Sequence, residues 1–174
     1  PRIANIYMNA VEVTNAETLA EEEYYIDEVQ PDMSFRLYAD NVLSAEVWVN
    51  ETNSLTESGK NKLLATQPDK VRMERDMQGN VIRFFVRWEE VNNFDCSRAG
   101  DRHYCIDRMN KLLIFGDGVH VQIPRNTADV SFLVQISRCG GAEGNLEPGM
   151  INASMSNLLF INNIRNPMKS YGGS

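Results

Sequence analysis

The sequence is poor in the residues that bind transition metals or form disulfides. Its 174 residues include only two histidines and three cysteines. The cysteines, Cys96, Cys105 and Cys139, are odd in number and form no C-x-x-C pair. Their spacing predicts free thiols in a reducing compartment rather than a disulfide framework or a structural zinc site. We therefore expect no bound metal and no cofactor.

Long apolar runs and basic clusters are also missing. The longest wholly apolar runs, such as residues 158–161, fall far short of the ~20 residues that a membrane helix needs. No basic segment followed by an apolar one opens the chain, so we expect no signal peptide. The formal net charge is −7, and the scattered arginines form no basic patch of the kind that duplex binding requires. The sequence predicts neither a membrane nor a nucleic-acid partner.

Length and composition are those of a globular domain. Hydrophobic residues make up 43% of the chain and charged residues 24%, which is ordinary for a folded domain. The sequence predicts a single β-rich domain over residues 1–174, with any subdomain boundary in the polar, turn-rich stretch near residues 51–68. The chain begins with proline rather than methionine and ends abruptly after two glycines. We expect a processed chain or a piece of a longer protein.

Alternation of apolar and polar residues predicts a series of short strands. The pattern covers residues 5–13, 24–26, 34–38, 42–49, 70–76, 81–89, 102–108, 111–115 and 130–137, with a last short element over 157–164. The clearest signal is a hairpin whose turn is Met77-Gln-Gly-Asn80. The predicted fold class is mainly β, an antiparallel β-sandwich or barrel-like domain with little helix.

Two segments depart from the strand pattern. Residues 14–17 fit a capping box, which predicts a short helix running toward the acidic residues 21–23. Residues 50–68 are polar and rich in turn formers, which predicts a loop. Among the strands, Phe85 and Trp48 fall on the less apolar faces. Each of these two side chains either meets a second core layer or anchors an interface.

The groups that could carry chemistry do not form a convincing catalytic arrangement. His103, Cys105 and Asp107 share one face of a predicted strand, but alternation alone brings them together. The Gly-Asp-Gly run at 116–118 lacks the oxygen ligands of a calcium loop and the following helix of a phosphate loop. It predicts a tight turn, with glycines that can adopt a positive φ and an aspartate that bonds its own backbone. Glu89 and Glu90 point to opposite faces of a strand, unlike the facing carboxylates of a glycosidase. We expect a protein that is not an enzyme.

Five short motifs occur in order through the second half of the chain. They are Trp88-Glu-Glu-Val with Asn92-Asn-Phe94; Asp101-Arg102-His-Tyr104 with Asp107; Phe115-Gly116-Asp117-Gly118 with Pro124; Gly140-Gly141-Ala-Glu-Gly144-Asn145; and Asn166-Pro167 with the glycine pair at 172–173. In this order and with these gaps they resemble the baseplate J-like proteins of contractile phage tails and related injection systems. The resemblance covers residues 88–173 well and residues 1–87 loosely.

Two positions depart from the family pattern. Val121 stands where the family has the third glycine of a G-D-G-x-x-G run, and no glycine follows Pro124 within residues 125–129. We expect the connection between the flanking strands to differ in shape from that of the family.

The resemblance implies a structural role. It implies a β-rich piece of a larger baseplate wedge protein, preceding a more helical carboxyl-terminal region. Such a protein takes part in baseplate assembly and in the rearrangement that accompanies sheath contraction. The implied partners are other wedge and hub proteins and further copies of the chain in the assembled ring. The implied location is the tail baseplate of the virion, after assembly in the host cytoplasm. No catalytic residue, metal or cofactor is implied.

The alternative is a β-sandwich binding module that recognises carbohydrate or a cell-surface ligand. Its aromatic platform would come from Tyr7, Tyr24, Tyr25 and Trp48. Aromatic side chains present large rigid contact areas, which suits such recognition.

Overall fold

The structure, a computed structural model, describes residues 10–11, 13–125, 129–154, 159 and 161–171. The chain divides into two compact units, residues 18–138 and residues 1–17 with 139–174. The segment 51–68 lies inside the larger unit. The expected strand at 5–13, the expected element at 157–164 and the glycine pair at 172–173 fall wholly or partly outside the described residues.

The described strands form two sheets. The first contains β1 (Ala16–Thr18), β10 (Phe132–Cys139), β4 (Val42–Asn50), β6 (Val81–Arg87) and β5 (Val71–Arg75) in that order, and β2 (Glu22–Tyr24) also pairs with β10. The second contains β3 (Ser34–Arg36), β9 (Leu112–Phe115), β8 (His103–Asp107) and β7 (Glu89–Glu90). The pairings of β10 with β2 and β4, of β6 with β4 and β5, and of β9 with β3 and β8 are antiparallel, whereas β7 and β8 pair in parallel. The predicted fold class, a mainly β domain of antiparallel sheets, is confirmed.

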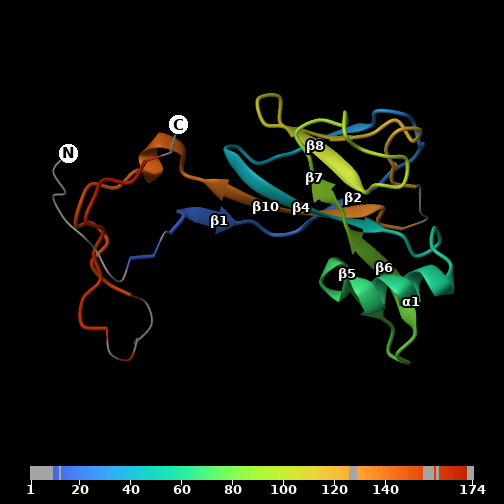
Figure 1. Ribbon diagram of the computed structural model, residues 1–174, viewed down its shortest axis with the longest axis horizontal. Helices are drawn as coiled ribbons and strands as arrows, with labels where there is room; N and C mark the ends of the chain where they lie inside the picture. The colour runs from blue at the N-terminus through green and yellow to red at the C-terminus, as the bar shows by residue number, and fades with distance from the viewer. Residues whose placement is uncertain (1–9, 12, 126–128, 155–158, 160, 172–174) are drawn as a thin grey trace. The chain divides into compact units, whose positions relative to one another are not determined.

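The main hydrophobic core lies between these two sheets, which Figure 1 shows one above the other. Both sheets contribute alternate residues: Val47, Val49, Phe132, Val134 and Ile136 from β4 and β10, and Tyr104, Leu113 and Phe115 from β8 and β9. The ring of Phe132 stacks on Tyr24 at 4.9 Å and meets Phe115 edge to face at 5.1 Å. Such aromatic pairs add specific geometry to the burial of apolar area.

A second buried cluster lies on the other face of the six-stranded sheet. Phe85, Val130 and Leu133 form it, and the half-buried Trp48 packs against it. Leu133 is directly opposite Trp48 in the register of β10 with β4, so both project to one face. Phe85 is 0% exposed. Phe85 therefore belongs to a second layer of the core and does not anchor an interface.

The helix expected over residues 14–23 is wrong, because this segment forms β1 and β2. Both short strands pair with β10, and the Leu19 N–H donates to the Ile136 carbonyl at 2.8 Å. Tyr24 is opposite Phe132 in this pairing. The partner strand supplies the backbone hydrogen bonds that a helix would supply internally, and the aromatic ring gains a place in the core.

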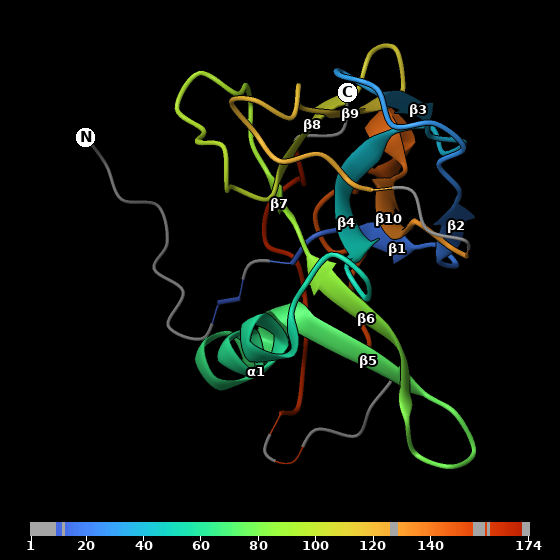
Figure 2. The same cartoon turned by 90° about the vertical axis from the view of Figure 1, so that its right-hand side faces the viewer.

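The loop expected over residues 50–68 is also wrong in part, because it contains the helix α1 (Glu57–Thr66). The Thr56 hydroxyl accepts the Gly59 N–H at 3.2 Å and so caps the helix. No residue of α1 is fully buried, so the helix lacks the apolar stripe by which a sequence reveals a helix. Figure 2 shows α1 beside β5 and β6, and the Lys60 ammonium lies 6.0 Å from the Phe84 ring centroid. None of the helices among the described residues has the length and apolar character needed to cross a membrane.

The predicted hairpin is confirmed as β5 and β6. Its turn is organised by Asp76, whose carboxylate accepts the N–H groups of Gln78 at 2.9 Å and Asn80 at 2.8 Å. Gly79 has φ +87°, a conformation that favours glycine. The alternation over residues 81–89 therefore predicted β6, which ends at Arg87. The residues Met77-Gln-Gly-Asn80 predicted the position of the turn.

Candidate functional site

A buried charged cluster joins three distant parts of the chain. The Glu51 carboxylate is 2% exposed and accepts two hydrogen bonds from Arg102, at 2.7 Å from Nε and 2.7 Å from Nη2. The Trp88 indole N–H donates to the same carboxylate at 3.0 Å, and Trp88 is also 2% exposed. Two of the motif residues singled out in the sequence, Trp88 and Arg102, thus meet on one carboxylate.

The strands bring these three residues together through backbone hydrogen bonds. Glu51 follows the last residue of β4, and its N–H donates to the Phe84 carbonyl at 2.9 Å. The Trp88 N–H donates to Val47 at 2.9 Å, between β6 and β7. Arg102 precedes β8, and its carbonyl accepts the Glu89 N–H at 2.8 Å. The cluster therefore connects the end of β4 with the β6–β7 junction and with the start of β8. These contacts link the two sheets.

Electrostatics favour the charged form of the cation in this cluster. The hydrogen bonds from Arg102 to Glu51 raise the pKa of the guanidinium, against the opposing effect of burial. A bidentate guanidinium–carboxylate pair also fixes the relative orientation of the two side chains, because both groups are planar. A buried pair of this kind sets the relative position of its strands, since losing one partner leaves the other uncompensated.

The other motif residues near β8 also hold backbone in place. The Tyr104 hydroxyl donates to the Ala45 carbonyl at 2.5 Å, and burial raises the pKa of Tyr104. The Asp101 carboxylate accepts the Arg98 N–H at 2.9 Å. Asp107 accepts the N–H of Asn110 at 2.9 Å, and the hydrogen bonds from Asn110 lower the pKa of Asp107.

The Gly-Asp-Gly run forms the tight turn that the sequence predicts. The Asp117 carboxylate accepts the N–H groups of Val119 at 2.9 Å and His120 at 2.7 Å, and it lies 2.6 Å from His120 Nδ1. The hydrogen bond from the His120 ring and those from the backbone lower the pKa of Asp117 well below its usual range. Gly118 has φ +77°, which explains a glycine at this position.

Gly116 makes room for the Val121 side chain. A Cβ on Gly116 would lie 2.6 Å from the Val121 Cβ, and Val121 is almost fully buried. We expect Gly116→Ala to lower the free energy of unfolding by about 1–3 kcal/mol through overpacking, as measured by urea denaturation. Gly100→Ala is the matched control, because a Cβ there would meet nothing within 4 Å. Equal stability of the two variants would contradict this role of Gly116.

The remaining motif residues divide between the two units. Pro124 is buried in the larger unit. In the smaller unit, residues 141–144 form a short 3-10 turn that Gly140 precedes and Asn145 follows, and Gly144 lies where a Cβ would approach the Asn15 side chain at 3.1 Å. Gly141, in this turn, has φ +57°.

Asn166, which precedes Pro167, joins the two extended segments of the smaller unit. Its side chain accepts the Ile151 N–H at 2.9 Å and donates to the Glu147 carbonyl at 2.9 Å. Its carbonyl accepts the Gly149 N–H at 2.9 Å. One asparagine side chain thus replaces part of a strand ladder, which is a structural use of this motif.

Glu51 is the residue of this cluster that sequence reasoning missed. The pattern placed it at the start of a polar loop, where a carboxylate is ordinarily solvated. Its partner Arg102 is 51 residues away along the chain, and no local spacing connects them. The available signal was its position one residue beyond a strongly alternating strand.

His103, one of the groups considered for catalysis, contacts a serine and a glutamate that the sequence pattern did not connect with it. His103 Nδ1 lies 2.8 Å from the Ser97 hydroxyl, while His103 Nε2 lies 3.9 Å from a Glu89 carboxylate oxygen. The second distance is too long for a hydrogen bond. Glu89 pairs instead with Lys70, and this hydrogen bond lowers the pKa of Glu89. The three groups are therefore not aligned as a serine–histidine–acid relay.

The aromatic platform proposed for a carbohydrate module does not form as expected. Tyr24 is buried against Phe132 in the core, and only part of the Trp48 side chain is exposed. Tyr25 is exposed, and Tyr7 lies outside the described residues. Tyr24, Tyr25 and Trp48 therefore do not offer a shared surface for stacking on a sugar.

The described residues contain no group of three or more histidine, cysteine, aspartate or glutamate side chains placed to hold a metal ion. Cys96, Cys105 and Cys139 form no disulfide among the described residues. Comparison of the chain with protein-family models, curated proteins and solved structures gives no match.

Proposed function

We propose that this chain is a structural component of a contractile phage-tail baseplate, a wedge protein of the J-like kind. Its role is in baseplate assembly and in the rearrangement that accompanies sheath contraction. The proposal rests first on the ordered motifs of residues 88–173, since several weak motifs in one order are more specific than any of them alone.

One observation supports a structural use of those motifs. Trp88 and Arg102, from two different motifs, both bind the buried Glu51 carboxylate within the fold. Their polar groups are occupied inside the larger unit rather than presented to a ligand. A subunit that transmits a mechanical rearrangement needs strands whose relative positions are fixed. A buried bidentate ion pair supplies such a constraint.

The proposal also includes the partners and the location that the sequence resemblance implies. The partners are other wedge and hub proteins and further copies of this chain in a ring, and the location is the tail baseplate after assembly in the host cytoplasm. The protein acts without a catalytic residue, metal or cofactor. Function therefore depends on the stability of the fold and on its contact surfaces.

Deletion and complementation test the proposal in cells that produce tailed particles. Without the chain, we expect released particles to lack complete baseplates in negative-stain electron microscopy. Wild-type chain and a His103→Ala variant are expected to restore them equally, whereas Arg102→Met is expected to restore them poorly. Complete baseplates in the deletion strain would contradict the structural role, and failure of His103→Ala despite normal folding would favour an enzyme.

A further inference from the structure

A cavity of about 650 Å³ opens in the larger unit beside the Gly-Asp-Gly turn. Three segments contribute its lining residues, namely Val29 after β2, Ala99 before β8, and Gly118, Gln122, Ile123 and Arg125 from the connection between β9 and β10. This volume is within the range of about 300–1,000 Å³ that is typical of ligand sites. Its walls are anchored, since Asp117 fixes the turn and the Gln122 N–H donates to the Asp101 carbonyl at 3.2 Å.

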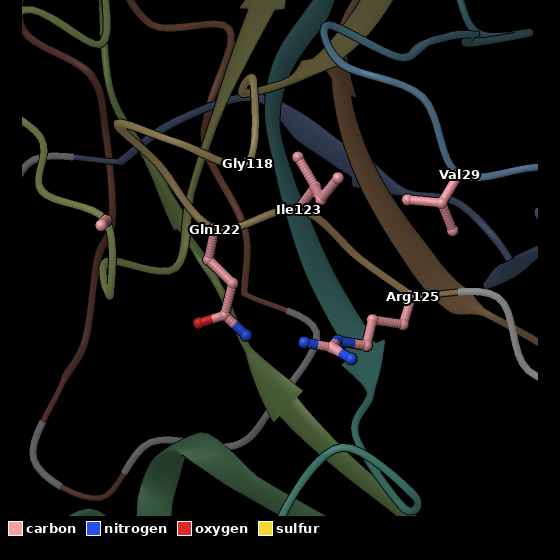
Figure 3. Close-up of a pocket in the computed structure, with 6 residues that line it drawn as sticks. Val29, Gly118, Gln122, Ile123 and Arg125 are labelled. Carbon is pink, nitrogen blue, oxygen red and sulfur yellow. The ribbon is translucent and has the colours of Figure 1, made fainter.

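The cavity combines one cation, one amide and two apolar side chains. In Figure 3 the ends of the Gln122 and Arg125 side chains lie on the same side of the segment that joins them, and Ile123 projects to the other side. Ile123 packs near Gly118, where an added Cβ would lie 3.1 Å from its Cδ1. Val29 supplies a second apolar contact from a separate loop. A ligand in the cavity would therefore meet charge and apolar surface together.

Arg125 differs in its pairing from five other arginines of the larger unit. Arg72, Arg83, Arg87, Arg102 and Arg108 each form an ion pair with an acidic side chain of this chain. The Arg125 guanidinium, by contrast, has no hydrogen bond or ion pair with any described residue. Arg125 is exposed and lines the cavity, so its guanidinium is accessible to an external anion.

We propose that this cavity binds a peptide segment of a partner protein that carries a carboxylate between apolar side chains. The planar guanidinium of Arg125 matches a carboxylate through two parallel hydrogen bonds. The Gln122 amide can both donate to and accept from a peptide backbone. Val29 and Ile123 contact the flanking apolar side chains. The inference rests on the proposed function only for the choice of a protein partner over a free small acid.

Titration followed by ¹H–¹⁵N NMR tests the site with a defined probe, the peptide acetyl-Leu-Asp-Val-amide. We expect saturable shifts of the Ala99, Gly118 and Gln122 amide signals, with a Kd of about 1 mM or tighter. Acetyl-Leu-Asn-Val-amide, which lacks the charge, is expected to bind at least about tenfold more weakly. Arg125→Gln is expected to cause a similar loss for the aspartate peptide.

Arg36→Gln is the matched control. Arg36 lies on β3 outside the cavity, is exposed, and its side chain likewise has no ion pair with a described residue. We expect this variant to bind the peptide as the wild type does. Equal weakening by both substitutions would show attraction by general charge and would overturn the site. Absence of saturable shifts would also overturn it.

A third ligand tests whether the bound carboxylate belongs to a peptide or to a free small acid. Isovalerate, a small branched acid, is expected to bind at least about tenfold more weakly than the aspartate peptide, because it lacks the backbone and the second apolar contact. Equal affinity for isovalerate would replace the peptide site with a small-acid site. These outcomes are separate from baseplate assembly: a chain that supports assembly and binds no peptide contradicts only this inference.

Discussion

Replacing Arg102 with methionine is expected to lower the free energy of unfolding by about 3–5 kcal/mol. Methionine keeps much of the side-chain volume but leaves the buried Glu51 carboxylate with the Trp88 indole N–H as its one remaining side-chain donor among the described residues. An uncompensated buried charge is far more costly than the loss of an exposed pair. Urea denaturation of the variant and the wild type measures this difference.

Two further variants separate loss of the pair from general damage. Arg72→Met removes the exposed pair of Arg72 with Glu21 and is expected to cost about 0–1 kcal/mol. Glu51→Gln combined with Arg102→Met is expected to cost less than the sum of the single substitutions, because the two residues interact directly. If Arg102→Met is as mild as Arg72→Met, the cluster does not hold the sheets together.

Phe85→Ala is expected to lower the free energy of unfolding by about 3–5 kcal/mol. Phe85 is completely buried with Val130 and Leu133, so truncation loses apolar burial and leaves a cavity. Tyr38→Ala is the matched aromatic control, because Tyr38 is 78% exposed and its loss is expected to change stability by about 0.5 kcal/mol or less. Thermal denaturation of the three proteins measures the difference. An unchanged melting temperature for Phe85→Ala would contradict the contribution of this buried cluster to stability.

Most of the strands could be predicted because each of them carries its own local pattern of alternating side chains. In β4 and β10, alternation follows from one face meeting the main core, and the hairpin of β5 and β6 adds turn residues that fix its register. Such signals are local, since side chains on a strand alternate whatever the partner is.

The errors have one physical cause, dependence on partners distant in sequence. Residues 16–18 and 22–24 form strands because β10 is available to pair with them, and no local preference shows this. The helix α1 depends on its cap at Thr56 and on its position beside β5 and β6 rather than on an apolar stripe. Propensity is a weak guide where tertiary contacts decide.

The candidate site could be predicted in part. The motifs identified Trp88 and Arg102, and the turn chemistry of residues 116–118 followed from glycine and aspartate alone. Glu51 was missed because burial of a carboxylate depends on its cation, which lies beyond the reach of any local pattern. Ser97 was missed because it lies in the loop between β7 and β8, and strand periodicity does not predict the path of a loop.

Immunogold electron microscopy tests the central claim most directly. An antibody raised against this chain would be applied to particles released by the producing cells, both intact and with disrupted baseplates. The proposed function predicts label at the baseplate end of contractile tails, or on disrupted baseplates if assembly covers the epitopes. Label on fibres or elsewhere on the particle, or no label on either preparation from an antibody that binds the purified chain, would contradict it.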